Sequence, residues 1–190
     1  MNYDCIIIGG GISGLTAGIK CVHEGLSCAI ISSGMSALHF SSGSIDMLGY
    51  TDDGDVIYEP HKYIDEFIDS HKTHPYAKCG RDILAESLQF FQEQVANRNV
   101  QFFHNNSSNH FHVTALGTLK PTYLSQRSVF NEKIRIGFAD KPSIAIINFE
   151  GFRDFHPELA ASNLKKNQLF NEFEIFARTI QLSEFNNTDK

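Results

Sequence analysis

A glycine-rich segment near the N-terminus constrains the fold of this chain most. Residues 9–14 contain three glycines in the spacing Gly-x-Gly-x-x-Gly. The segment follows a short apolar run, 3–8, which predicts a strand, and it begins a run, 12–24, which predicts a helix. Gly25 suits the end of that helix, and the apolar run 27–31 predicts a second strand. This order predicts a β-α-β unit of the dinucleotide-binding kind.

Each glycine of the motif has a steric reason at its position. Gly9 lets the chain turn sharply, Gly11 has no Cβ to keep the backbone from a pyrophosphate, and Gly14 lets the helix lie close on the strand. The helix then directs its free N–H groups and the positive end of its dipole at the phosphates. The alternative is a glycine-rich turn that binds nothing. The residues assigned to cofactor binding here are Gly9, Gly10, Gly11, Ile12, Ser13 and Gly14.

The end of the second predicted strand departs from the usual pattern. That pattern places an Asp or Glu there, which accepts hydrogen bonds from an adenosine ribose. Ser32 and Ser33 occupy the position here, with no Arg or Lys beside them. A hydroxyl can still bond to a ribose, more weakly than a carboxylate does. Both serines are therefore assigned to the cofactor, and FMN is as plausible as FAD.

Composition limits the classes of protein to which the chain can belong. It has 190 residues and a net charge of −6 with no basic block, which argues against nucleic acid as a partner. No apolar run is long enough to predict a membrane-spanning helix, and no signal peptide is apparent. The four cysteines form no C-x-x-C pair, so we expect reduced, buried thiols.

Two histidines could bind a metal. His110 and His112 would lie on one side of a strand, but no third ligand stands at a suitable spacing. We therefore expect a polar strand face there and no metal site. No residue pattern identifies a catalytic base, so the catalytic residues stay unknown at this point.

The rest of the chain alternates between helical and extended patterns. A long polar loop is expected over 33–60 and a strand buried on both faces over 143–149. The aromatic pairs Phe90-Phe91 and Phe102-Phe103 are expected in the core. Helices are predicted over 60–71, 82–98 and 157–166, and short strands over 100–104, 111–115, 118–124 and 134–138, with a hairpin turn at Leu116-Gly117.

Four stretches in order along the chain resemble one family, the B subunits of anaerobic glycerol-3-phosphate dehydrogenases, over its N-terminal part. They cover nearly the whole chain. The stretches are Ile8-Gly-Gly-Gly-Ile-Ser-Gly-Leu15, Ser36-Ala-Leu-His-Phe-Ser-Ser-Gly-Ser-Ile-Asp46, Leu116-Gly-Thr-Leu119, and Gly151-Phe-Arg-Asp-Phe155 with Leu159-Ala-Ala161.

The resemblance gives a role to the serine-rich loop. In related flavoproteins of the fumarate-reductase kind, a loop of small residues passes the pyrophosphate and the flavin ring. Ser41, Ser42, Gly43 and Ser44 resemble its core, and small hydroxyl residues suit it because they let the backbone approach and offer donors and acceptors. The alternative is a solvated turn without a ligand. Some relatives link a histidine of this loop to the flavin; here Ala37 occupies that position, so we expect non-covalent FMN or FAD.

The resemblance also implies an activity, partners and a fold. The activity is oxidation of sn-glycerol 3-phosphate to dihydroxyacetone phosphate, with electrons passing through flavin to quinone in anaerobic respiration. The partners are a larger catalytic flavoprotein subunit and a membrane-associated iron–sulfur subunit, which would hold this cytoplasmic subunit peripherally at the inner membrane. The alternatives are a non-catalytic nucleotide-binding or structural subunit and an inactive fragment.

The fold that we expect is α/β. A Rossmann-like FAD/NAD(P)-binding fold begins with the β-α-β unit and is interrupted by an α+β substrate or cap segment. Residues 1–104 would form the N-terminal part of the flavin-binding domain, and residues 105–190 a β-rich, then α/β, part of an incomplete second region. Members of the family continue far past residue 190, so we expect this chain to be truncated.

Overall fold

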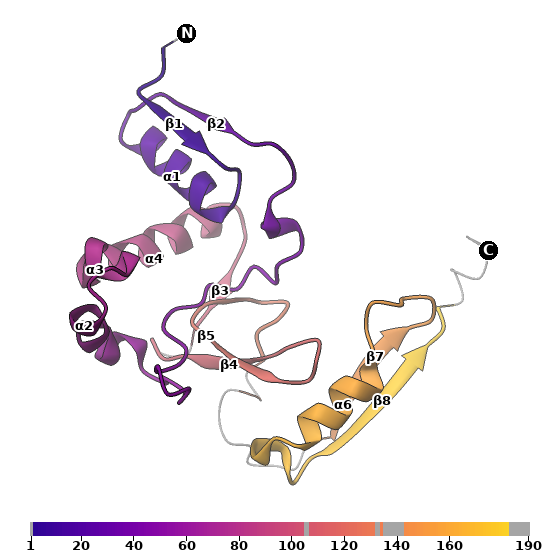
Figure 1. Ribbon diagram of the computed structural model, residues 1–190. Coiled ribbons are helices and arrows are strands. Elements are labelled where there is room, and N and C mark those ends of the chain that lie inside the picture. The colour runs from indigo at the N-terminus through magenta and orange to yellow at the C-terminus, as the bar shows by residue number, and fades with distance from the viewer. Residues whose placement is uncertain (1, 105–106, 132–133, 135–142, 183–190) are drawn as a thin grey trace. The chain divides into compact units, whose positions relative to one another are not determined.

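The computed structural model describes residues 2–104, 107–131, 134 and 143–182, and Figure 1 shows its helices and strands. The strands are β1 (Cys5–Ile8), β2 (Cys28–Ile31), β3 (Phe102–Phe103), β4 (His110–Val113), β5 (Leu119–Thr122), β6 (Ser125–Gln126), β7 (Ser143–Phe149) and β8 (Glu174–Ile180). The helices are α1 (Ile12–His23), α2 (Pro60–Ser70), α3 (Pro75–Cys79), α4 (Arg81–Ala96) and α6 (Pro157–Lys165), with 3-10 turns η1 (Ala37–His39) and η2 (Gln168–Phe170).

The chain divides into two compact units, which are described separately. Unit 1 comprises Met1–Ile45, Ile64–Phe103 and Leu124–Val129. Unit 2 comprises Asp46–Tyr63, His104–Tyr123 and Phe130–Lys190. Helices and strands occur in both units, so the fold is mixed α/β. The glycine motif lies in unit 1.

Unit 1 begins with the predicted β-α-β unit, which is confirmed. Strands β1 and β2 pair in parallel from Cys5 opposite Cys28 to Ile8 opposite Ile31. Helix α1 crosses between them and packs on one face (Figure 1). The approach is close because Gly18 has no side chain: a Cβ there would lie 3.0 Å from Cδ1 of Ile30.

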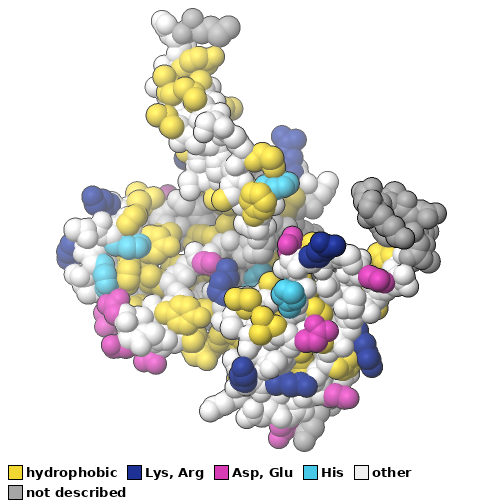
Figure 2. All heavy atoms as spheres, turned by 45° about the vertical axis from the view of Figure 1, so that its right-hand side comes forward, with side chains coloured by type: hydrophobic (Ala, Val, Ile, Leu, Met, Phe, Trp, Pro, Cys, Tyr) yellow, Lys and Arg dark blue, Asp and Glu magenta, His cyan; other side chains and the backbone are white. Residues whose placement is uncertain are grey.

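The apolar side chains on the other face of this two-stranded sheet are exposed in the described part of the chain. Ile6, Ile8 and Ile31 are 61%, 89% and 57% exposed. Parallel strands usually carry apolar side chains on both faces because both faces are covered. Figure 2 shows hydrophobic side chains at the molecular surface on the face that it presents.

The aromatic pairs of unit 1 lie in a different environment from the expected one. Phe90 and Phe91 on α4, and Phe102 and Phe103 on β3, are only half-buried, so their assignment to the core was wrong. Strand β3 is also shorter than the expected 100–104, and it pairs antiparallel with β6. Helix α3 was not predicted.

Unit 2 contains the hairpin predicted at Leu116-Gly117. Strands β4 and β5 pair antiparallel, and the turn between them is held by a hydrogen bond from the Thr114 N–H to the Thr118 carbonyl, 2.8 Å. Gly117 has a φ of +75°, and a Cβ there would lie 2.0 Å from the Ala160 carbonyl oxygen. A strand over 118–124 was predicted, but β5 ends at Thr122.

Unit 2 ends in a second parallel β-α-β arrangement. Strands β7 and β8 pair in register over seven residues each, and α6 lies between them in sequence. The cluster at the core of this part consists of Ala161, Leu164, Phe170 and Ile175. Strand β8 was missed by the sequence analysis.

Strand β7 is not buried on both faces as expected. Its exposure alternates: Ile144 and Ile146 pack against the core cluster, whereas Ile147 and Phe149 are exposed. The strand has one face covered by α6 and one face open in the described part of the chain.

The remaining expectations have mixed outcomes. The loop over 33–60 is not wholly irregular, since it contains η1 and an antiparallel bridge between Tyr50 and Val56. All four cysteines are free, but Cys79 is exposed and the others are only half-buried. The strand expected over 134–138 lies outside the described residues apart from Ile134. No described helix has the length and apolar character needed to cross a membrane.

Candidate functional site

The glycine motif forms the turn between β1 and α1. Gly9 has a φ of +110°, a conformation that disfavours side chains, and its N–H donates to the Ile31 carbonyl oxygen at 2.8 Å. Gly11 is the N-cap residue of α1, and no side chain caps this helix end. A Cβ on Gly11 would have no atom within 4 Å, so open space lies in front of the backbone here. A phosphate group fits these features, because uncapped N–H groups at a helix start favour an anion.

The turn is packed tightly on its inner side. A Cβ on Gly14 would lie 2.1 Å from the Gly9 carbonyl oxygen and 3.3 Å from Cγ2 of Ile7. A Cβ on Gly10 would lie 3.1 Å from the Ser32 hydroxyl oxygen. The end of β2 therefore adjoins the motif, and Ser32 lies beside it, with its hydroxyl donating to the Gly34 carbonyl oxygen at 3.0 Å.

The serine-rich loop is ordered by its own hydroxyl groups. The Gly43 N–H donates to the Ser41 hydroxyl oxygen at 3.1 Å, and the Ser44 N–H donates to the Ser42 hydroxyl oxygen at 3.3 Å. The Ser42 hydroxyl in turn donates to that of Ser44 at 3.1 Å. These bonds give the loop a defined conformation, with Gly43 at a φ of +72°.

A Cβ on Gly43 would lie 1.8 Å from Nε2 of Gln126, so the loop approaches β6 closely. Ile45 then pairs with Leu124 through two backbone hydrogen bonds of 2.9 and 3.0 Å. His39 of η1 faces the ring of Phe40 at 4.9 Å between centroids, and Phe40 is exposed. The C-terminal end of the loop is therefore held by backbone hydrogen bonds, whereas η1 is exposed to solvent.

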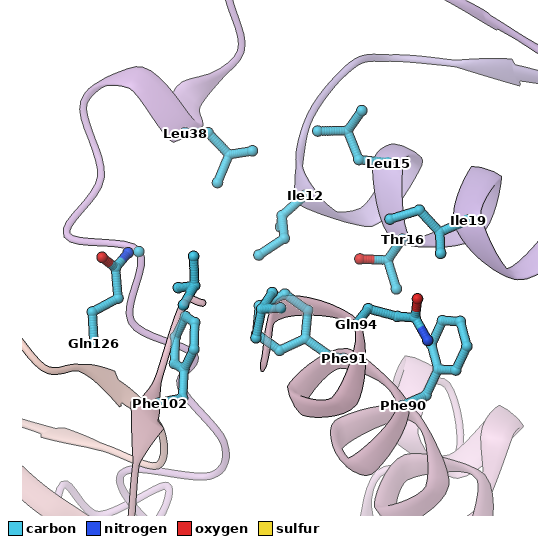
Figure 3. A pocket seen from close by; sticks show the side chains of 13 residues that line it. Ile12, Leu15, Thr16, Ile19, Leu38, Phe90, Phe91, Gln94, Phe102 and Gln126 are labelled. Carbon is cyan, nitrogen blue, oxygen red and sulfur yellow. The ribbon is translucent and has the colours of Figure 1, made fainter. Parts of the chain in front are cut away.

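An apolar pocket of about 270 Å³ lies within unit 1 (Figure 3). Side chains of α1 and α4 point toward one another across it, and Leu38 and Phe102 add further apolar surface. The rings of Phe91 and Phe102 meet edge to face at 5.2 Å. The residues that line the pocket are Ile12, Leu15, Thr16, Ile19, Leu38, Gly43, Phe90, Phe91, Gln94, Val95, Val100, Phe102 and Gln126.

The pocket brings together two segments that the sequence analysis assigned separately. Ile12 comes from the glycine motif and Gly43 from the serine-rich loop. The contributions of Phe91, Gln94 and Gln126 were missed, because nothing in their local sequence shows that they line a cavity. The other predicted residues, including Ser33 and Ser41, do not line this pocket.

A polar cluster in unit 2 surrounds His112. Lys120 lies opposite His112 in the β4–β5 ladder, and its Nζ is 2.9 Å from Oδ2 of Asp46. The Thr122 hydroxyl donates to the other carboxylate oxygen of Asp46. Burial lowers the pKa of His112, the Lys120 cation lowers it further, and the Asp46 carboxylate opposes both effects.

His110, on the same strand as His112, does not belong to a polar strand face as expected. It is buried, and its ring lies edge to face against Phe130 at 5.0 Å. Among the described residues no group of three or more His, Cys, Asp or Glu side chains is arranged to hold a metal ion.

The β-α-β unit and the glycine turn are typical of dinucleotide-binding proteins, and comparison with known families agrees. A family model described as FAD binding domain matches residues 4–183. The chain therefore belongs to the family of FAD binding domains.

Curated relatives give a more particular likeness. Proteins named as the B subunit of anaerobic glycerol-3-phosphate dehydrogenase are 39% identical in Aliivibrio fischeri (strain MJ11) and 36% identical in Actinobacillus pleuropneumoniae (serotype 5b), over 100% and 97% of this chain. The resemblance seen in the sequence is thereby confirmed. The chain spans 42% and 43% of the length of these two relatives. No solved structure matches it.

Proposed function

We propose that the turn from Gly9 to Gly14 binds the pyrophosphate of non-covalently held FAD. The observation that carries this proposal is the open space in front of Gly11, at a helix start that no side chain caps. The family favours FAD over FMN. When bound, a flavin supplies two-electron redox chemistry, and the protein positions it and excludes competing reactions.

The two serine segments extend this site in the proposal. Ser32 and Ser33 adjoin the ribose, in place of the usual carboxylate. Ser41, Ser42, Gly43 and Ser44 present small groups to the cofactor, with their hydroxyls already oriented by hydrogen bonds within the loop.

The pocket beside the motif is suited to an apolar ring of the cofactor. Its walls are aliphatic and aromatic, and the amides of Gln94 and Gln126 can bond to the polar edge of a ring. Ile12 and Gly43 connect this pocket to the proposed phosphate site.

The activity we propose is the one for which the relatives are named, dehydrogenation of sn-glycerol 3-phosphate. We propose further that the electrons pass toward quinone. A larger flavoprotein subunit and a membrane-associated iron–sulfur subunit would be the partners, with peripheral attachment to the membrane through the latter. Residues 1–104 would carry the N-terminal part of a Rossmann-like flavin domain, and residues 105–190 part of a second region that is β-rich and then α/β.

A chimaera tests this proposal directly. Residues 1–190 replace the matched 191 residues of the Aliivibrio fischeri relative, and the purified complex is assayed for flavin content and for dye reduction by glycerol 3-phosphate. We expect bound FAD and substrate-dependent reduction. The Gly11→Val variant should lose the flavin, because a branched side chain occupies the phosphate's space.

The same chimaera separates the alternatives. Flavin without substrate-dependent reduction would favour a non-catalytic nucleotide-binding subunit, and unchanged flavin content in Gly11→Val would exclude the proposed phosphate site. After acid precipitation the flavin should appear in the supernatant, because Ala37 occupies the position of a linking histidine. Flavin retained in the washed pellet would show a covalent bond instead.

A further inference from the structure

The sheet of β7 and β8 has a second face that no described part of the chain covers. Residues paired in register point to the same side, so the side chains opposite α6 form one continuous surface. Its apolar members are Ile147, Phe149, Phe176 and Ile180, which are 39%, 46%, 37% and 40% exposed. Phe149 lies directly opposite Ile180 in the ladder. We call this surface the open β7–β8 face.

The open β7–β8 face carries charges of both signs, the Arg178 guanidinium near its middle and the Glu174 carboxylate at the start of β8. Arg178 is paired with Ile147 in the ladder, and its guanidinium carbon lies 5.9 Å from the centroid of the Phe176 ring. It makes no ion pair with the described residues. A group that covers this face must therefore be apolar and must also satisfy a guanidinium, which prefers a carboxylate.

The geometry of the sheet specifies which secondary structure fits. Parallel strands are found almost only where helices cover both faces of the sheet. Helix α6 covers one face of β7 and β8, with Ala161 and Leu164 packed in the core cluster. The matching element for the open face is an amphipathic helix, with an apolar stripe over Ile147 and Phe176 and an Asp or Glu beside Arg178.

The curated relatives show where such a helix could originate. More than half of the Aliivibrio fischeri protein lies outside the matched region, since the chain spans 42% of its length. We propose that the open β7–β8 face is a docking surface for an acidic amphipathic helix from the polypeptide that lies outside the matched region in these relatives. The helix completes a three-layer α/β arrangement with α6 and the β7–β8 sheet.

Co-expression tests this docking surface without reference to the flavin. Residues 1–190 are produced together with a tagged segment that comprises the part of the Aliivibrio fischeri relative outside the match. We expect the two to co-purify at a ratio of about one to one. Exposure of amides in β7 and β8 to hydrogen exchange should fall in the complex.

Charged substitutions then locate the contact. Ile147→Lys and Phe176→Lys should each reduce co-purification about tenfold or more. Thr179→Lys is the matched control, because it adds the same charge to β8 at a position on the other side of the sheet. Arg178→Glu should also weaken the complex, and Arg178→Lys should retain most of it. All four positions are exposed, so the variants should keep the thermal melt of the parent chain.

Three results would overturn the proposal. One is failure of the two segments to co-purify. Another is co-purification that Ile147→Lys and Phe176→Lys leave unchanged. The third is concentration-dependent self-association of residues 1–190 alone that Ile147→Lys abolishes, because the face would then bind a second copy. None of these depends on whether the Gly9–Gly14 turn binds FAD.

Discussion

Gly11 and Gly14 are three residues apart, yet they differ in the space that surrounds them. A Cβ on Gly14 would lie 2.1 Å from a backbone carbonyl oxygen, whereas a Cβ on Gly11 would meet nothing within 4 Å. The motif therefore combines a glycine required by packing with one that the fold itself does not require. The proposed approach of the cofactor phosphates to the backbone would account for the second.

We expect Gly14→Ala to lower the free energy of unfolding by about 1–3 kcal/mol, since the helix must move away from the turn. Gly11→Ala should change it by less than about 1 kcal/mol, because only a helix-cap preference is altered. Urea denaturation of both variants and the parent chain measures the difference. Equal destabilisation by the two substitutions would mean that the room for a side chain does not differ between the two positions.

At the same scale, the pKa of His112 depends on two charged neighbours, Asp46 and Lys120. Asp46→Asn removes the carboxylate that raises the pKa of His112, so this pKa should fall further below its ordinary value of about 6.5. Lys120→Gln removes a repelling cation and should raise the pKa. Titration of the imidazole Cε1 proton by NMR measures both changes. Shifts in the opposite directions would contradict the arrangement of these three side chains.

At the scale of elements, the pKa of His112 predicts a pH dependence for unit 2. Because this pKa is lowered in the folded chain, the unfolded chain binds more protons between the folded value and about 6.5. Stability should therefore fall as the pH decreases below about 6.5, and level off below the folded pKa. His112→Asn should flatten this slope when urea midpoints are compared across pH 5–7.5. A slope unchanged by the substitution would assign the effect to another group.

The elements that the sequence predicted are those with a strong local signal. Helix α1 starts at a glycine motif, α6 starts at Pro157, and β7 is a nearly continuous apolar run. Strand β8 was missed because Glu174 and Arg178 interrupt its apolar pattern. Both side chains are exposed on the same face of the strand, which is why charged residues are tolerated there.

The pocket could not be predicted for a different reason. Its walls come from α1, α4, β3, β6 and the serine-rich loop, which are far apart in sequence. Phe91 and Phe102 were expected in a core because aromatic pairs usually are. Only the pairing of β3 with β6 and the placement of α4 beside α1 show that these rings face a cavity.

At the scale of the whole molecule, both parallel β-α-β arrangements share one property. Each has a helix on one face of a two-stranded sheet and exposed apolar side chains on the other, as Ile8 and Phe149 illustrate. Exposed apolar faces of this kind usually mark interaction surfaces. The chain spans less than half the length of the curated relatives.

The most direct test of the proposed cofactor site is an NMR titration of residues 1–190 with FAD, because it detects weak binding and assigns it to individual backbone amides. We expect shifts of backbone amide signals concentrated at Gly9–Gly14 and Ser32, and their loss in Gly11→Val. Adenosine alone should shift the Gly11 amide much less than FAD, since it lacks the pyrophosphate. Shifts confined to other segments, or an unchanged titration in Gly11→Val, would contradict the assignment of this turn to the flavin phosphates.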